Sequence, residues 1–165
     1  VGRRLPGRVT TLNKPPRMPH LVILYTANLD LPADSGGTDM GLLCRNLADA
    51  MLSVRDEQGR QVFPTGGTRV LAYPAAHSAL ADGGAAGQAA GLGADYAFVY
   101  LNLRMGPGRS AAVHQRVGEA LHAVVRAHFA GQLADRPIGI TLQIDEGREV
   151  FDAKTSSLHP LFNRH

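Results

Sequence analysis

The chain has 165 residues, 44% of them hydrophobic and 19% charged, which suits one soluble globular domain or two small fused units. Its single cysteine, Cys44, excludes an intrachain disulfide and a metal site of several cysteines, and no apolar run is long enough to span a membrane. Residues 1–17 hold five basic and no acidic side chains, so subtracting their +5 from the formal charge of +3 leaves −2 for the rest. The basic balance therefore gives no reason to expect nucleic-acid binding by the folded part.

Residues 1–18 precede the first pattern of secondary structure. They show neither helical nor strand periodicity, contain three prolines, and lack the apolar region of a secretory signal. We expect them to be a disordered leader or the result of a start assigned too far upstream. The folded domain is then expected to cover 19–162, with a polar tail at 147–165 that docks on a neighbouring subunit.

The first half of the domain, 19–80, reads as strand, helix and strand. A continuous apolar run from Leu21 predicts a strand that is covered on both faces. Asp39 is a good helix cap, and apolar residues recur after it at helical spacing until Gln58-Gly59, where we expect the helix to end. A second strand is predicted over 68–74.

The second half, 95–146, repeats this plan after a connector at 81–94 that is rich in alanine and glycine. A strand is predicted over 95–105, a long helix opening at Ser110, and a final strand beginning at Pro137. The fold class is therefore α/β, with two consecutive β-α-β units in which parallel strands are joined by a right-handed crossover. Two helices on one side leave the other side of the sheet bare. We expect Val99, Leu101 and Leu103 to lie there and to be covered by oligomerisation.

Pro19 stands just before the first strand, in the sequence Met18-Pro19-His20. Proline cannot donate to a sheet ladder, so its structural interpretation is that of a strand-entry residue. If Met18 is an initiator that is removed, Pro19 instead carries a free secondary amine, which is a compact base. Within a longer chain the same nitrogen is an amide and has no basic lone pair.

Two arginines follow glycine-rich turns. Arg109 comes after Gly106-Pro107-Gly108 and begins a helix, where free N–H groups and the helix dipole favour an anion. A guanidinium placed there can hold a carboxylate with two hydrogen bonds, although a solvated first-turn arginine is the simpler interpretation. Arg69 begins a strand, and on the sequence alone a surface or salt-bridge role explains it better than substrate binding does. The scattered histidines show no zinc-ligand spacing, and Cys44 is expected to be an inert core thiol.

Several short motifs together resemble the 5-carboxymethyl-2-hydroxymuconate Δ-isomerase family of the tautomerase superfamily. They are the Met-Pro start before an apolar strand and the segments listed next: Phe63-Pro64 with Gly67-Thr68-Arg69, Asp95-Tyr96-Ala97-Phe98-Val99, Met105-Gly106-Pro107-Gly108-Arg109-Ser110, and Leu158-His159-Pro160-Leu161-Phe162. The chain departs from the family in the 18 residues before Pro19 and in a longer connector.

The resemblance implies a fold like that of macrophage migration inhibitory factor, assembled as a homotrimer with active sites near subunit boundaries and no cofactor or metal. It implies a cytoplasmic bacterial isomerase in 4-hydroxyphenylacetate degradation through homoprotocatechuate. Pro19 would be its catalytic base, and Arg69 and Arg109 would bind the carboxylated dienol substrate. An apolar pocket and two nearby cations would lower the pKa of the Pro19 amine and keep it neutral near pH 7.

Two kinds of rival remain open. One is another proline-based tautomerase, or a hydratase or dehalogenase, on the same fold. The other is a non-catalytic trimeric binding protein in which the leader blocks Pro19. The state of the Pro19 nitrogen separates the enzymes from the binding protein, because only a free amine can act as the base.

Overall fold

The computed structural model describes residues 19–148 and 150–162; the expected leader at 1–18 and the last three residues of the expected tail lie outside this part of the chain. The strands are β1 (His20–Thr26), β2 (Arg69–Ala75), β3 (Ala97–Met105) and β4 (Ile138–Glu146). The α-helices are α1 (Met40–Ser53), α2 (Ala85–Ala89), α3 (Ala111–His128) and α4 (Ala130–Asp135). Single 3-10 turns are η1 (Ala27–Asp30), η2 (Ala33–Ser35), η3 (Thr65–Gly67) and η4 (His159–Leu161).

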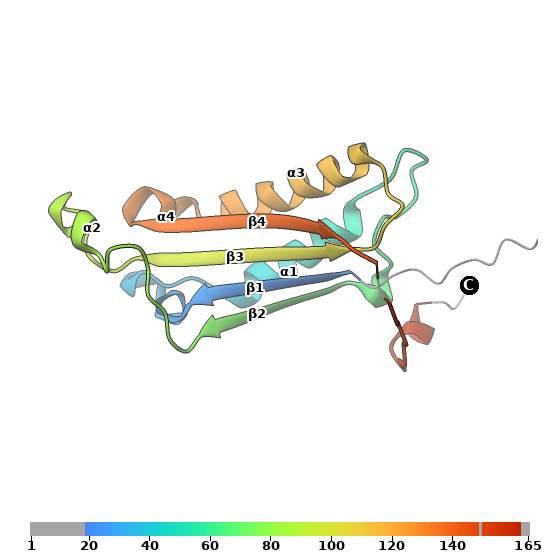
Figure 1. The fold of residues 1–165 in the computed structure, drawn as a ribbon, viewed down its shortest axis with the longest axis horizontal. Helices are drawn as coiled ribbons and strands as arrows, with labels where there is room; N and C mark the ends of the chain where they lie inside the picture. The colour runs from blue at the N-terminus through green and yellow to red at the C-terminus, as the bar shows by residue number, and fades with distance from the viewer. Residues whose placement is uncertain (1–18, 149, 163–165) are drawn as a thin grey trace, which may run out of the picture.

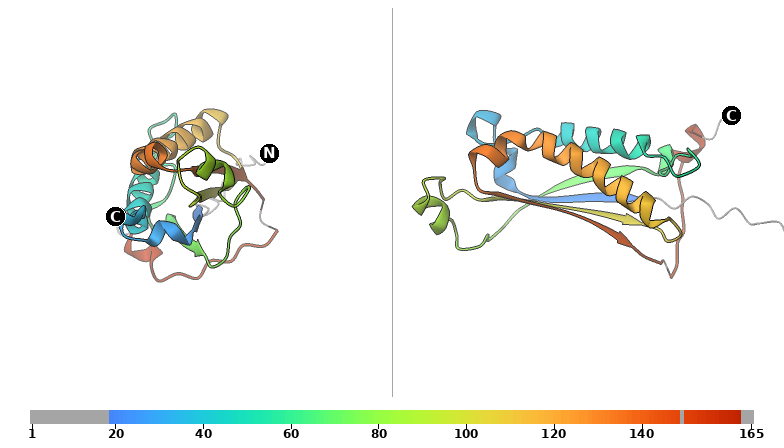
Figure 2. Two further views of the ribbon diagram at one scale, coloured as in Figure 1. Left: turned by 90° about the vertical axis from the view of Figure 1, so that its left-hand side faces the viewer. Right: turned by 90° about the horizontal axis from the view of Figure 1, so that it is seen from above.

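The four strands form one sheet in the order β2-β1-β3-β4. β1 runs parallel to β2 and β3 runs parallel to β4, whereas β1 and β3 pair antiparallel at the centre. Helices α1 and α3 lie on the same side of the sheet (Figure 1), which the view from above in Figure 2 shows as two layers. This arrangement confirms the predicted fold of two consecutive β-α-β units.

Both long helices begin at the caps that the sequence predicts. The Asp39 carboxylate accepts the N–H of Leu42 at 2.9 Å, and the Ser110 hydroxyl accepts the N–H of Val113 at 3.2 Å. Each bond satisfies a backbone donor that has no partner within the helix. The helices then bury one stripe each against the sheet, formed by the residues Met40, Leu43, Leu47 and Met51 of α1 and Val113, Val117, Leu121 and Val125 of α3.

The expectation for the face of β3 is wrong. Val99, Leu101 and Leu103 are fully buried beneath the helices and do not lie on the bare side of the sheet. Successive strand residues point to opposite faces, so the bare side instead carries the alternate residues of β3, which include Phe98 and Tyr100. The bare side also carries Asn102 and Arg104, so the alternation of apolar and polar residues in the second half of β3 agrees with the face that the helices cover.

Helix α1 also ends five residues before the position predicted from Gln58-Gly59. Val54 adopts an extended backbone with ψ 134°, and the chain turns back in a short hairpin in which Arg55 bridges to Gln61. The Asp56 carboxylate accepts the backbone N–H groups of Gln58 and Arg60, both at 2.9 Å. An aspartate that captures backbone donors in this way stabilises a turn at the expense of a helix. We refer to residues 54–62 as the α1-β2 hairpin.

The alanine- and glycine-rich connector contains the short helix α2, which the sequence interpretation did not foresee. The Tyr96 hydroxyl accepts the N–H of Gly87 at 2.8 Å and ties this helix to the start of β3. Figure 1 places α2 at the end of the sheet opposite to the start of β1. Within residues 19–148 and 150–162, no helix combines the length and the apolar character needed to cross a membrane.

Protonation of His128 is expected to destabilise the fold. Its Nε2 lies 2.8 Å from the Thr38 hydroxyl, and burial lowers the pKa of the imidazole although the Asp39 carboxylate opposes the shift. Because the unfolded chain then binds the proton more tightly, the free energy of unfolding should fall as the pH drops through about 6.5. The loss should be complete below the lowered pKa of the folded state.

Urea unfolding on both sides of this pH window measures the effect. His128→Gln should lose less stability on acidification than the parent protein, and His122→Gln, at an exposed position of the same helix, is the matched control. Equal acid-dependent losses in the parent and in His128→Gln would contradict the prediction.

Candidate active site at the Pro19 end of the sheet

Pro19 is buried and directly precedes β1. The next residue, His20, is exposed and lies opposite Arg69 of β2 on one side and Arg104 of β3 on the other. Strand alternation therefore puts Pro19 on the same side as the buried Leu21, under the helix layer. Figure 1 shows that β1 and β2 begin, and β3 and β4 end, at this one end of the sheet.

Arg69 is the first residue of β2 and is half-buried. Its Nη1 donates to the Gly67 carbonyl oxygen at 3.1 Å, so the guanidinium lies against the turn η3 that precedes the strand. Burial, and then the charge of Arg69, lower the pKa of the neighbouring His20 imidazole. Burial and a neighbouring guanidinium both penalise a positively charged imidazole here, and the same two effects favour the neutral form of an amine.

Arg109 lies in the loop between β3 and α3 and is half-buried. Its Nη2 donates to the Val62 carbonyl oxygen at 2.8 Å, and its guanidinium carbon lies 5.8 Å from the centre of the Phe63 ring. The next residue, Ser110, caps α3 and donates its hydroxyl proton to the Glu57 carboxylate, a contact that lowers the pKa of Glu57. The loop that carries Arg109 is thus attached to the α1-β2 hairpin.

One short segment, 62–68, contacts both predicted arginines. Val62 and Phe63 at its start are buried and hold Arg109, whereas Gly67 near its end accepts from Arg69. The structure therefore brings Pro19, Arg69 and Arg109 to the same end of the sheet, with both cations attached to one scaffold. The pair suits an anion with more than one carboxylate, because each guanidinium can present a planar pair of donors.

The sequence interpretation missed the contributions of Glu57 and Phe63. The predicted helix end at Gln58-Gly59 includes Glu57 in α1, whereas the structure places it in the α1-β2 hairpin, where it accepts from Ser110. The signal for its true position was the tetrapeptide Asp56 to Gly59, in which a turn-forming aspartate precedes a glycine that adopts φ 76°. The cation-π contact between Phe63 and Arg109 joins distant parts of the chain and has no local signal.

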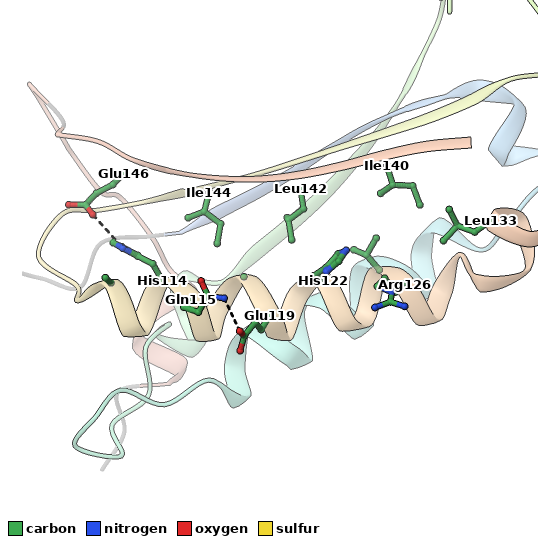
Figure 3. A pocket seen from close by; sticks show the side chains of 13 residues that line it. His114, Gln115, Glu119, His122, Arg126, Leu133, Ile140, Leu142, Ile144 and Glu146 are labelled. Carbon is green, nitrogen blue, oxygen red and sulfur yellow. Dashed lines mark hydrogen bonds and ion pairs between the residues drawn. The ribbon is translucent and has the colours of Figure 1, made fainter. Parts of the chain in front are cut away.

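A large cavity lies outside this cluster. It is a groove of about 880 Å³ between α3 and β4, with the apolar side chains of Ile140, Leu142 and Ile144 along one wall (Figure 3). The helix side carries polar residues, and at one end His114 Nε2 lies 3.2 Å from a Glu146 carboxylate oxygen. None of Pro19, Arg69 or Arg109 lines the groove.

A metal site or a reactive cysteine would be a second kind of centre among the residues that the structure describes. Among residues 19–148 and 150–162, no three His, Cys, Asp or Glu side chains gather closely enough to hold a metal ion. Cys44 is half-buried on α1, where it packs against the core, and burial raises the pKa of its thiol. A thiol of raised pKa is a poor nucleophile, as expected for a core residue.

Comparison with known proteins identifies close relatives. The model of the 5-carboxymethyl-2-hydroxymuconate isomerase family matches residues 19–162. A solved structure of a 5-carboxymethyl-2-hydroxymuconate delta-isomerase is 60% identical, with a TM-score of 0.84 over 90% of this chain and 95% of that one. A 5-carboxymethyl-2-hydroxymuconate isomerase from Deinococcus radiodurans R1 is 32% identical, with a TM-score of 0.70 over 90% of this chain and 96% of that one.

A curated Escherichia coli protein, 5-carboxymethyl-2-hydroxymuconate Delta-isomerase, is 34% identical to the chain over 68 residues, which is 41% of this chain. The match spans about half of that relative, 54% of its length.

Proposed function

The chain belongs to the 5-carboxymethyl-2-hydroxymuconate isomerase family, and from this premise we propose that it isomerises 5-carboxymethyl-2-hydroxymuconate with Pro19 as the base. The observation that carries the proposal is the position of Pro19, which is buried and directly precedes the first pair of β1 and β2, His20 and Arg69, at the end of the sheet that also holds Arg109. The match of the family model begins at Pro19 itself, which supports a functional start at this residue.

The proposed reaction is a proton transfer in which the substrate keeps all its atoms. The free Pro19 nitrogen takes the proton of the 2-hydroxyl group while the O–H electron pair forms the ketone and shifts the double bonds. The same nitrogen then returns the proton to C5 at the far end of the conjugated system. Arg69 and Arg109 bind the substrate carboxylates and stabilise the negative charge that develops on the enolate oxygen.

A neutral amine is required for the first step. An unperturbed α-amine is largely protonated near pH 7, since its ordinary pKa is about 8. Burial of Pro19 under the helix layer and the positive charge of Arg69 both penalise the ammonium form. Burial and the charge of Arg69 also lower the pKa of His20, which follows Pro19 in the chain and pairs with Arg69 in the sheet.

Substrate preference is expected to follow the number of carboxylates. The ultraviolet absorbance change on 5-carboxymethyl-2-hydroxymuconate should report a higher kcat/KM than that on phenylenolpyruvate, which offers a single carboxylate to the two arginines. Equal or faster turnover of the simpler acid would favour another proline-based tautomerase. Turnover of neither acid, together with a blocked Pro19, would favour the binding protein.

We further propose that the protein forms a homotrimer through the bare side of its sheet. This side carries Leu24, Leu71 and Tyr73, which are 48%, 45% and 50% exposed in one chain and lie side by side in the strand register. Together they form an apolar surface on adjacent strands that gains stability when covered. Val150 and Phe151 of the tail add further exposed apolar surface.

Light scattering coupled to gel filtration should therefore give three times the chain mass. Leu24→Glu should dissociate the assembly, whereas Leu42→Glu, a 51% exposed position on α1, should leave the mass unchanged. A monomeric parent protein would refute the trimer. A trimeric metabolic enzyme of this kind would act in the bacterial cytoplasm, within 4-hydroxyphenylacetate degradation through homoprotocatechuate.

A further inference from the structure

The C-terminal tail returns to the end of the sheet where Pro19 lies. The N–H of Gly147 donates to the Met105 carbonyl oxygen at 3.1 Å, so the tail starts beside the end of β3. Figure 1 and the right-hand view of Figure 2 show its last turn, η4, lying next to η3. We refer to residues 156–162 as the tail turn.

The tail turn has a defined fold of its own. The Ser156 hydroxyl oxygen accepts the N–H groups of Leu158 and His159 at 3.1 and 3.2 Å. Backbone bonds from Leu161 to Leu158 and from Phe162 to His159, both 3.1 Å, close the 3-10 turn. These local hydrogen bonds define the backbone conformation of the tail turn, so the side chains that it packs against η3 have defined positions.

The tail turn packs directly on Gly66, the central residue of η3. Gly66 is buried, and a Cβ atom placed on it would lie 3.1 Å from Phe162 Cδ2 and 3.4 Å from the Cα of His159. Its backbone φ lies outside the left-handed region, so alanine would be compatible with the backbone itself. The approach of the tail therefore leaves little room for a side chain at this position, and a Cβ atom there would require the Phe162 ring to shift by a few tenths of an ångström.

Turn η3, on which the tail turn packs, also holds Arg69. The Pro64 carbonyl oxygen accepts from the N–H groups of Gly67 and Thr68 and from the Thr68 hydroxyl, and the Gly67 carbonyl oxygen accepts from Arg69. A displacement of η3 would therefore move the guanidinium that lies on it. A shift of about 1 Å at a charged contact is enough to weaken substrate binding appreciably.

We propose that the tail turn is a positioning element for Arg69: docked on Gly66, it fixes η3 and with it the guanidinium that binds a substrate carboxylate. Gly66, His159 and Phe162 are positioning residues in this scheme and do not touch the substrate. The inference rests on the substrate-binding role proposed for Arg69 and adds the part of the chain that holds this arginine in place.

Two variants remove the docking in opposite ways. Gly66→Ala adds a methyl group that pushes against the tail turn and should displace it, whereas Phe162→Ala removes the contacting ring from a partly exposed position and should leave the core intact. Gly131→Ala is the matched control, since a Cβ atom there would have no neighbour within 4 Å. In the active form of the protein, both docking variants should raise KM about tenfold with kcat changed less, as expected when part of a charged contact is lost.

Two further measurements separate positioning from a general loss of structure. Trypsin should cut after Lys154 and release residues 155–165 faster from both docking variants than from the control. In an Arg69→Ala background, Gly66→Ala should cause no further rise in KM, because the residue through which the tail acts is already gone.

The inference falls if both docking variants leave KM unchanged while Arg69→Ala raises it, or if the effect of Gly66→Ala is equally large without Arg69. If Arg69→Ala itself leaves KM unchanged, the proposed substrate-binding role of Arg69 falls first and takes the inference with it.

Discussion

Blocking or replacing Pro19 should reduce kcat/KM by about 10²- to 10⁴-fold, which is the range that a positioned general base contributes. A chain that keeps residues 1–18 attached has an amide at Pro19, which has no basic lone pair and cannot accept the substrate proton. Proteolytic removal of these residues should restore the activity. After removal of residues 1–18, Pro19→Ala leaves a primary amine without the rigid ring. Its activity should lie between that of the chain that keeps these residues and that of the processed parent protein.

Pro74→Ala is the matched proline control, because Pro74 is exposed near the other end of β2. Mass spectrometry identifies the first residue of each preparation, and the ultraviolet assay measures kcat/KM on the same samples. A preparation that retains its first 18 residues and still works at the full rate would refute the role of Pro19.

Arg109→Ala should lower kcat/KM by about 10- to 150-fold, which corresponds to the loss of one charge-assisted hydrogen bond of about 1.5–3 kcal/mol. Arg109→Lys keeps the charge but loses the planar fork that donates two hydrogen bonds, so it should retain only part of the activity. KM should rise because Arg109 binds the carboxylate in the ground state, and kcat should fall because the charge of the enolate grows in the transition state.

Arg126→Ala removes an exposed cation from the last turn of α3, the helix that follows Arg109, and is the control for a simple change of net charge. Circular dichroism should show both variants folded, since the core stripe of α3 does not include either residue. If Arg109→Ala and Arg126→Ala had the same small effect, the site at the start of α3 would not be an anion site.

Local signals in the sequence predicted most of the framework. The period of two in β4 and the period of 3.6 in α3, bounded by Ser110, are properties of neighbouring residues and need no tertiary information. The predicted end of α1 is wrong because Glu57 and Gln58 are good helix formers. The turn forms instead because the Asp56 carboxylate accepts two backbone N–H groups that follow it.

The parts that could not be predicted depend on contacts between distant segments. The face of Val99 is a different case, because the alternation of Leu101 and Leu103 with Asn102 and Arg104 is a local signal for the buried face, and the expectation of a bare face did not follow it. The packing of the tail turn on Gly66 could not be predicted from the sequence, because the two segments are far apart in the chain. The role proposed for Pro19 depends on the resemblance to a family, since a strand-entry proline and a catalytic one look the same in a single sequence.

The hairpin and turn between α1 and β2 carry a consequence for how this fold can diverge. Residues 54–68 hold Arg109 through Val62 and Phe63 and hold Arg69 through Gly67, so a residue gained or lost there would misalign two cations at once. The connector around α2 lies at the opposite end of the sheet and supports neither. Insertions and deletions among homologues should therefore accumulate in that connector and should be nearly absent from the crossover that precedes β2.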